Sequence, residues 1–320
     1  MQHLRLRLNA DFSGPHAWFF LARERGYFAA QGLDLELLPG DGAAVIVPGI
    51  GHDGVEAGYG DLNALAALAA RDATSAPIGV YQVFNQVPFT IAVRSDGPVH
   101  AVRDLAGRRL VGKPDDAAIL VFAALAAAAG LDPAAVSVQL STRPMGEQVR
   151  DLLLGGEADG VFGFVNTILA ASTPLGVEAS ALRFIEYVQW LPDLYGNGLM
   201  VSRRLLTESP GVVRALVHGL NRGVCETLQD LEAGMAALQR AAPGINLPVQ
   251  RRRLEGTIAK EMAHPETLRI GLGAVDAERL QRGIDQVARS CGWPRSPRAD
   301  ELFTPAFLPA LPERFPGRPG

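Results

Sequence analysis

The chain of 320 residues is poor in cysteine and in lysine. Its two cysteines, Cys225 and Cys291, are too few for a disulfide scaffold or a four-cysteine zinc site. One disulfide and two buried thiols both stay open. The lysines are Lys113 and Lys260, against 28 arginines, so chemistry that needs a lysine has two candidates.

Long apolar runs and a strong charge of one sign are also missing. No stretch approaches the roughly 18 consecutive apolar residues of a transmembrane helix. The net charge of −4 gives no footprint for nucleic acid, and 48% hydrophobic residues exclude a disordered chain. Residues 1–10 alternate apolar and polar side chains, which is typical of a strand and not of a secretory signal. The chain is therefore either cytoplasmic or a mature chain whose signal was removed.

Motifs for catalysis are absent as well. The sequence has no G-x-S-x-G elbow, phosphate-binding loop, H-E-x-x-H or C-x-x-C motif, and its six histidines show no metal-ligand spacing. We therefore expect no enzyme, no cofactor and no metal.

What is present is an alternation of strands and helices. Residues 1–88 and 89–198 each form an α/β block, and residues 210–291 are mainly helical. This order predicts an α/β fold with mostly parallel sheets. Predicted strands cover residues 3–8, 33–38, 55–59, 78–84, 89–94, 109–112, 136–140, 158–164, 183–188 and 198–202, and predicted helices 15–31, 61–71, 116–129, 145–154 and 166–171.

The chain passes twice between the two blocks, near residues 88–94 and 192–202. We therefore predict two lobes with a hinged cleft between them. Lobe 1 consists of residues 1–88 and 199–320, and lobe 2 of the inserted residues 89–198.

Four segments in order resemble one known family. They are GPHAWFFLARERGYFAAQGLDLELLPGDGAA from residue 14, RDLAGRRLVGKPDDAA from residue 103, LLLGGEADGVFGF from residue 152 and YGNGLMVSRRLLTESPGVVRALVHGLNRG from residue 195. Together they resemble the NMT1/THI5-like solute-binding proteins, relatives of the nitrate, sulfonate and taurine receptors of ABC importers.

The resemblance implies a type II periplasmic binding protein fold and a receptor that delivers a small molecule to an ABC permease and ATPase. It also implies a monomer in the periplasm that reaches the membrane only through the permease, with the export signal removed. An orphan sensor, a cytoplasmic protein and an enzyme of thiamin-pyrimidine synthesis on the same fold stay open. Lys113 is the lysine that such an enzyme would have near the cleft.

Ligands of open α/β sheets sit beyond the carboxyl ends of the strands. That rule selects the following candidate contacts: Asp11, Phe12, His16, Trp18, Tyr59, Asp61, Phe84, Asn85, Asp115, Asp116, Phe164, Asn166, Glu186, Tyr195 and Asn197.

Several candidates have a structural alternative. Asp61 and Asp116 sit where helix N-caps are expected. His16 is equally a structural histidine, and Trp18 has the helical spacing of a core residue. Asn85 precedes Pro88 and could satisfy backbone groups of the hinge.

The candidate contacts contain five carboxylates and few basic residues. The helix start at 113–116 reads Lys-Pro-Asp-Asp, and its two carboxylates would repel an anion. We therefore predict a neutral or cationic solute with N–H donors and a flat face, such as an aminopyrimidine. A sulfonate or nitrate ligand is the alternative.

Overall fold

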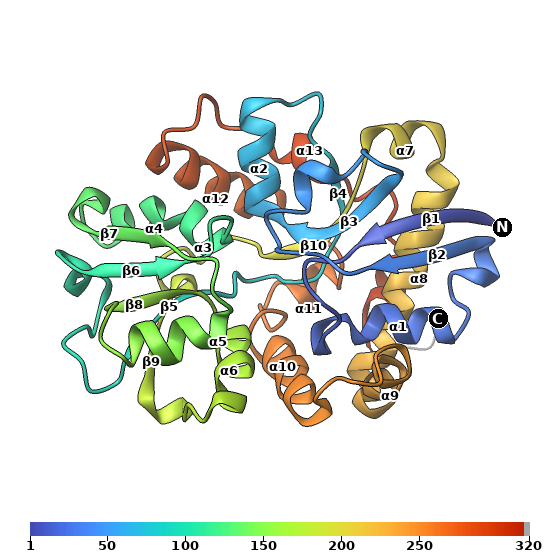
Figure 1. Cartoon of the computed structure of the whole chain (residues 1–320). Helices are drawn as coiled ribbons and strands as arrows, with labels where there is room; N and C mark the ends of the chain where they lie inside the picture. Colours follow the sequence, from blue (N-terminus) through green and yellow to red (C-terminus); the bar gives the residue numbers. More distant parts are fainter. Residues whose placement is uncertain (317–320) are drawn as a thin grey trace.

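The computed structural model describes residues 1–316. Its strands form two five-stranded sheets, which lie side by side as two lobes (Figure 1). The first sheet has the order β2-β1-β3-β10-β4 and the second β7-β6-β8-β5-β9. The strands are β1 Gln2–Arg7, β2 Leu33–Leu38, β3 Val55–Asp61, β4 Ile78–Gln82, β5 Phe89–Arg94, β6 Arg109–Gly112, β7 Ser137–Leu140, β8 Gly160–Phe164, β9 Leu182–Glu186 and β10 Asn197–Val201.

Both sheets are mixed. β1 pairs in parallel with β2 and β3, and β6 with β7 and β8. The returning strand β10 runs antiparallel between β3 and β4, and β5 runs antiparallel between β8 and β9. The predicted α/β class with two lobes is confirmed. The prediction of mostly parallel sheets is wrong, because β5 and β10 each pair antiparallel with both of their neighbours.

The helices cover both sheets and form the C-terminal part of the first lobe (Figure 1). They are α1 Ala17–Glu24, α2 Leu62–Arg71, α3 Ala117–Leu120, α4 Phe122–Ala128, α5 Met145–Glu147, α6 Val165–Ser172, α7 Arg203–Glu208, α8 Pro210–Gln229, α9 Leu231–Ala241, α10 Leu247–Ala259, α11 Thr267–Ile270, α12 Ala277–Ser290 and α13 Ala299–Leu302, and a π-helix spans Gln148–Leu153.

The helix predicted over residues 15–31 is wrong in its length. α1 ends at Glu24, and a short 3-10 turn, Ala29–Gln31, follows separately. Gly26 explains the break, because its φ of 69° belongs to the left-handed region that ends helices.

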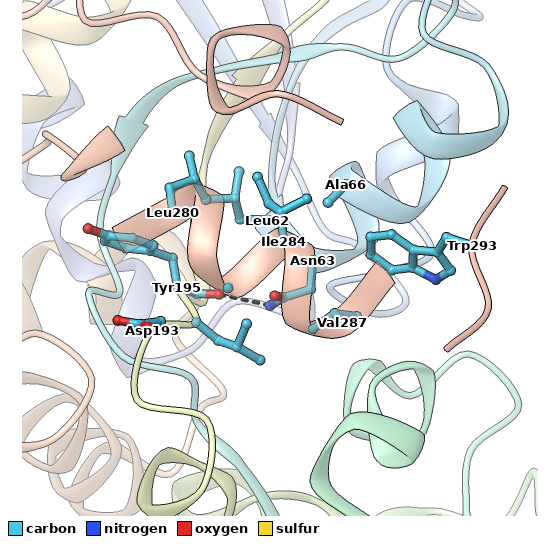
Figure 2. Close-up of a pocket in the computed structure, with 11 residues that line it drawn as sticks. Leu62, Asn63, Ala66, Asp193, Tyr195, Leu280, Ile284, Val287 and Trp293 are labelled. Atoms are coloured by element: carbon cyan, nitrogen blue, oxygen red, sulfur yellow. Dashed lines mark hydrogen bonds between the residues drawn. The ribbon is translucent and has the colours of Figure 1, made fainter. Parts of the chain in front are cut away.

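Helix α12 touches both lobes. Figure 2 shows Leu280 and Ile284 of α12 against Leu62 of α2, and both belong to a cluster of the first lobe. Val287, one turn later, belongs to the cluster of the second lobe. The predicted division places the whole of 199–320 in lobe 1, whereas α12 packs against both lobes.

The cysteines are free thiols in this structure. Cys225 and Cys291 are both half-buried and unpaired with each other. Within residues 1–316, no helix has the length and apolar character needed to cross a bilayer.

Candidate functional site

A cleft of about 510 Å³ lies between the lobes. Chain segments near residues 9–16, 40–43 and 84–88, with Asn197 and the end of α10, line it from the first lobe. Segments near 113–117, 142–145 and 163–167 line it from the second. These segments follow the carboxyl ends of β1, β2, β4, β6, β7 and β8, which is where the sheet rule places a ligand.

The structure brings eight of the fifteen predicted contacts to this cleft. They are Asp11, His16, Phe84, Asp115, Asp116, Phe164, Asn166 and Asn197.

Two predicted aromatic contacts lie in the core instead. Trp18 and Tyr59 have no exposed surface, because α1 and β3 both face the first lobe's main cluster. Phe12 and Phe20 pack edge to face, with 4.9 Å between ring centroids, and Phe12 is also outside the cleft lining. Neither Phe12 nor Trp18 therefore lines the cleft as an aromatic contact.

The remaining four predicted residues have structural partners. Asp61 caps α2 by accepting from the Ala64 N–H. Asn85 and Tyr195 both donate to Glu266. Glu186 forms an ion pair with Lys260, 3.0 Å from carboxylate to Nζ. Helix capping and hinge packing account for these four positions.

His16 is a buried, neutral imidazole in the lining of the cleft. Its Nδ1 accepts from the Ser13 backbone N–H at 3.2 Å, and its Nε2 lies 2.6 Å from Asn9 Oδ1. Because an amide oxygen only accepts and a backbone N–H only donates, the proton sits on Nε2. Burial, and the positive charge of Arg253, lower the pKa of His16 to about 3. His16 therefore fixes the loop after β1 without adding charge.

Two carboxyl groups of the lining are shifted toward the protonated form. Burial raises the pKa of Asp116 to about 6, although the Ala118 N–H partly offsets this. Burial also raises the pKa of Glu261 to about 7. Near neutral pH Glu261 can therefore offer a donor as well as an acceptor, whereas Asp116 remains mainly an acceptor.

The sequence-based selection missed the contribution of α10 and the turn after it. Arg253, Thr257 and Glu261 line the cleft from this region. Asn166 of α6 donates to Glu261 at 3.0 Å and 3.3 Å, so the two lobes meet here through a side-chain hydrogen bond. No local motif marks α10, because only the tertiary fold brings it to the sheet edge.

Arg253 is the cation that the charge argument overlooked. Its Nη2 contacts Thr167 Oγ1 at 3.2 Å, and its buried Nε has no partner. Burial lowers the pKa of its guanidinium to about 10, and the charge of Glu261 counters this shift. With Lys113 it faces Asp11, Asp41, Asp115, Asp116 and Glu261, so acidic groups still outnumber basic ones in the lining.

Two phenylalanines line the cleft, one from each lobe. Phe84, after β4, comes from the first lobe, and Phe164, at the end of β8, comes from the second. Phe84 is fixed by Tyr59, 6.1 Å between ring centroids, and Phe164 by Phe89 at 5.6 Å. A planar ligand between the lobes could contact one aromatic side chain from each.

Within residues 1–316, no group of three or more histidine, cysteine, aspartate or glutamate side chains is arranged to hold a metal ion. Neither cysteine lines the cleft, whereas Lys113 does.

Sequence comparison finds a matching family and a relative that spans nearly the whole chain. The family described as NMT1/THI5 like matches residues 13–233. A riboflavin-binding protein, RibY from Chloroflexus aurantiacus, is 23% identical over 316 residues, covering 97% of this chain and 87% of that protein.

Solved structures share the fold. The periplasmic aliphatic sulphonate binding protein SsuA from Escherichia coli superposes with a TM-score of 0.70 at 14% identity, covering 97% of this chain and 94% of that one. A DSZB mutant in complex with biphenyl-2-sulfinic acid superposes with a TM-score of 0.61 at 16% identity, covering 96% and 98%. DSZB is a desulfurization enzyme, so this fold also carries catalysis.

Proposed function

Since the chain belongs to the NMT1/THI5-like family, and has the two-lobed fold of the periplasmic binding proteins, we propose that it captures a planar, uncharged heteroaromatic solute between its lobes. It would do so outside the cytoplasm, as a monomer, and deliver the solute to an ABC permease and its ATPase.

The observation that carries this proposal is the pair Phe84 and Phe164. They reach the cleft from opposite lobes, so both can contact a flat ring only when the lobes are together. Ligand binding and lobe closure are then coupled, which is what a transport receptor requires.

The polar lining supports an uncharged ligand. His16 is neutral, and burial raises the pKa of Asp116 to about 6 and that of Glu261 to about 7, so these two groups carry less negative charge near neutral pH than ordinary carboxylates. The volume of about 510 Å³ suits a fused ring system with a polar substituent better than nitrate. The name of the riboflavin-binding relative agrees with a ligand of this class.

Arg253 supports a second candidate ligand. Its unpartnered Nε, close to the cleft, could serve a sulfonate group, as in the ligands of the SsuA neighbour. The carboxylates Asp11, Asp41 and Asp115 oppose this assignment.

Calorimetric titration and thermal denaturation test these candidates. We expect riboflavin or 4-amino-2-methylpyrimidine to bind and raise the melting temperature, and taurine and nitrate to do neither. Binding of taurine or nitrate alone would overturn the heterocycle proposal. Mass spectrometry of the bound heterocycle after prolonged incubation tests the receptor role, and we expect it unchanged. Conversion to a product would identify an enzyme.

A further inference from the structure

The side chain of Asn197 is buried without any hydrogen-bond partner. Neither its Oδ1 nor its Nδ2 is paired, and the residue has no exposed surface. In residues 1–316 every other buried side-chain amide has at least one partner: Asn63, Gln82, Asn85, Gln148 and Asn221. Buried polar groups are nearly always paired, so this exception needs an explanation.

The backbone holds Asn197 in this position. β10 lies between β3 and β4, and the Asn197 carbonyl accepts from the N–H groups of Val83 and Phe84. The main chain of Asn197 is therefore fixed on both sides. Asn197 also lines the ligand cleft, which is where a partner could arrive from solution.

A second unpartnered group lies at the same corner. Tyr59 on β3 faces Leu199, so by register it is one diagonal step from Asn197 on the same face of the sheet. Its hydroxyl is buried and has no partner either. The corner between β3 and β10 thus holds two polar side chains that the fold leaves unpaired.

The chemistry of a carboxamide narrows the partner. It presents an acceptor oxygen and a donor N–H side by side in one plane. The complementary edge has one donor next to one acceptor, as in a cyclic amide or an uncharged aminopyrimidine. A sulfonate or nitrate offers only acceptors, and an ammonium group or a protonated aminopyrimidine edge offers only donors.

We propose that Asn197 determines specificity by pairing with an adjacent donor and acceptor on one edge of an uncharged heterocycle. This inference rests on the proposed function, since it assumes that a heterocycle occupies the cleft. It adds which edge is recognised, by which residue, and in which protonation state of the ligand.

The test compares ligands with and without the donor. Riboflavin carries a ring imide N–H beside two carbonyls, and 3-methylriboflavin lacks that N–H. 4-Amino-2-methylpyrimidine likewise has amino N–H donors, which its dimethylamino analogue lacks. Dissociation constants are measured by calorimetry for the wild type and for Asn197→Leu, a variant of similar volume. Asn63→Leu replaces a buried amide that donates to the Tyr195 carbonyl and serves as the stability control.

In at least one of the two ligand pairs, we expect the wild type to bind the unmethylated ligand with a dissociation constant roughly tenfold or more lower than that of the methylated ligand. Asn197→Leu should remove this preference and leave the melting temperature of the free protein unchanged or higher, whereas Asn63→Leu should lower it. A loss of stability in Asn197→Leu with unchanged preference would show a structural role and overturn the inference. Equal binding of methylated and unmethylated ligands by the wild type would overturn it while the proposed function stands. Failure of every heterocycle to bind would overturn both.

Discussion

Glu266 and Arg279 form a buried ion pair at the hinge, with 2.9 Å between Oε1 and Nη1. Both side chains are at most 5% exposed. Arg279 donates to the carbonyl oxygens of Asn85 and Pro192, which lie on the two crossings between the lobes. Glu266 accepts from Asn85 and from the Tyr195 hydroxyl. One ion pair thereby fixes both hinge segments to the C-terminal helices.

Breaking this pair should destabilise the protein strongly. Arg279→Met leaves Glu266 buried without its cation, so we expect the free energy of unfolding to fall by about 3 kcal/mol or more. Arg282→Met is the matched control on the same helix, because its ion pair with Asp193 is solvent-exposed and worth about 1 kcal/mol or less. Denaturant unfolding measures both. If Arg279→Met lowered the free energy of unfolding no more than Arg282→Met, the buried ion pair would not be what fixes the hinge segments.

Gly256 of α10 is expected to control how closely the lobes approach. A Cβ at this position would lie 2.3 Å from Asn166 Oδ1 on the opposite lobe. Gly256→Ala should therefore displace Asn166 from Glu261 and weaken ligand binding, while the alanine favours α10 itself by up to about 1 kcal/mol. Titration calorimetry and small-angle scattering measure affinity and lobe separation. Gly244→Ala meets no neighbour and serves as control. Equal affinity in both variants would rule out this steric role.

Phe164 should contribute to ligand affinity through its ring. Phe164→Leu keeps an apolar side chain but removes the aromatic face, so we expect roughly 2- to 10-fold weaker binding of a heterocycle. Phe184→Leu, in the second lobe but outside the cleft lining, is the control. Ligand fluorescence or calorimetry gives the dissociation constants, and a comparable loss in both variants would argue against stacking.

The stability of the protein should depend on pH through Asp61. Burial raises the pKa of this helix-capping carboxyl to about 7. The folded state then keeps a proton that the unfolded chain has released between about pH 4 and 7, so Asp61 contributes stability at low pH that is lost as the pH rises. Asp61→Asn retains the cap and removes the titration. It should make the pH slope of the unfolding free energy less negative, by at most about 1.4 kcal/mol per pH unit.

Asp276, the cap of α12, gives the comparison. Hydrogen bonds from Arg279 and Arg269 lower the pKa of this carboxyl. Asp276 therefore contributes stability above the pH at which an ordinary carboxyl titrates, and this stability is lost as the pH falls. Asp276→Asn should change the slope in the opposite sense and only in acid. Identical slopes in the wild type and Asp61→Asn would contradict the buried titration of Asp61.

Local patterns predicted the elements well, because the signals that set them are local. The strands at Leu33–Leu38 and Phe89–Arg94 lie where alternation and β-branched residues place them. The Asp61 cap fixes the start of α2. The sheet-edge rule located Phe84, Phe164 and Asn197 because each lies at or near the end of a strand.

Burial and long-range contacts could not be predicted in the same way. Tyr59 sits next to a strand end, but its side chain faces α1, and only the packed lobe decides that. Arg253 and Glu261 lie about 165 residues or more beyond the first-lobe loops they join. The helix that carries Arg253 and precedes Glu261 has only a weak apolar stripe, so nothing local distinguishes these residues from solvent-facing side chains.

The place of β10 has a consequence for the order in which the chain can fold during synthesis. β3 and β4 do not touch each other, because β10 lies between them. The second sheet draws on one continuous stretch, residues 89–186, so it can be complete while the first still lacks its central strand. Until residue 201 has left the ribosome, two buried strands of the first lobe have open edges, and Arg279 comes later still. The first lobe, whose synthesis begins first, is therefore the lobe that completes its folding last.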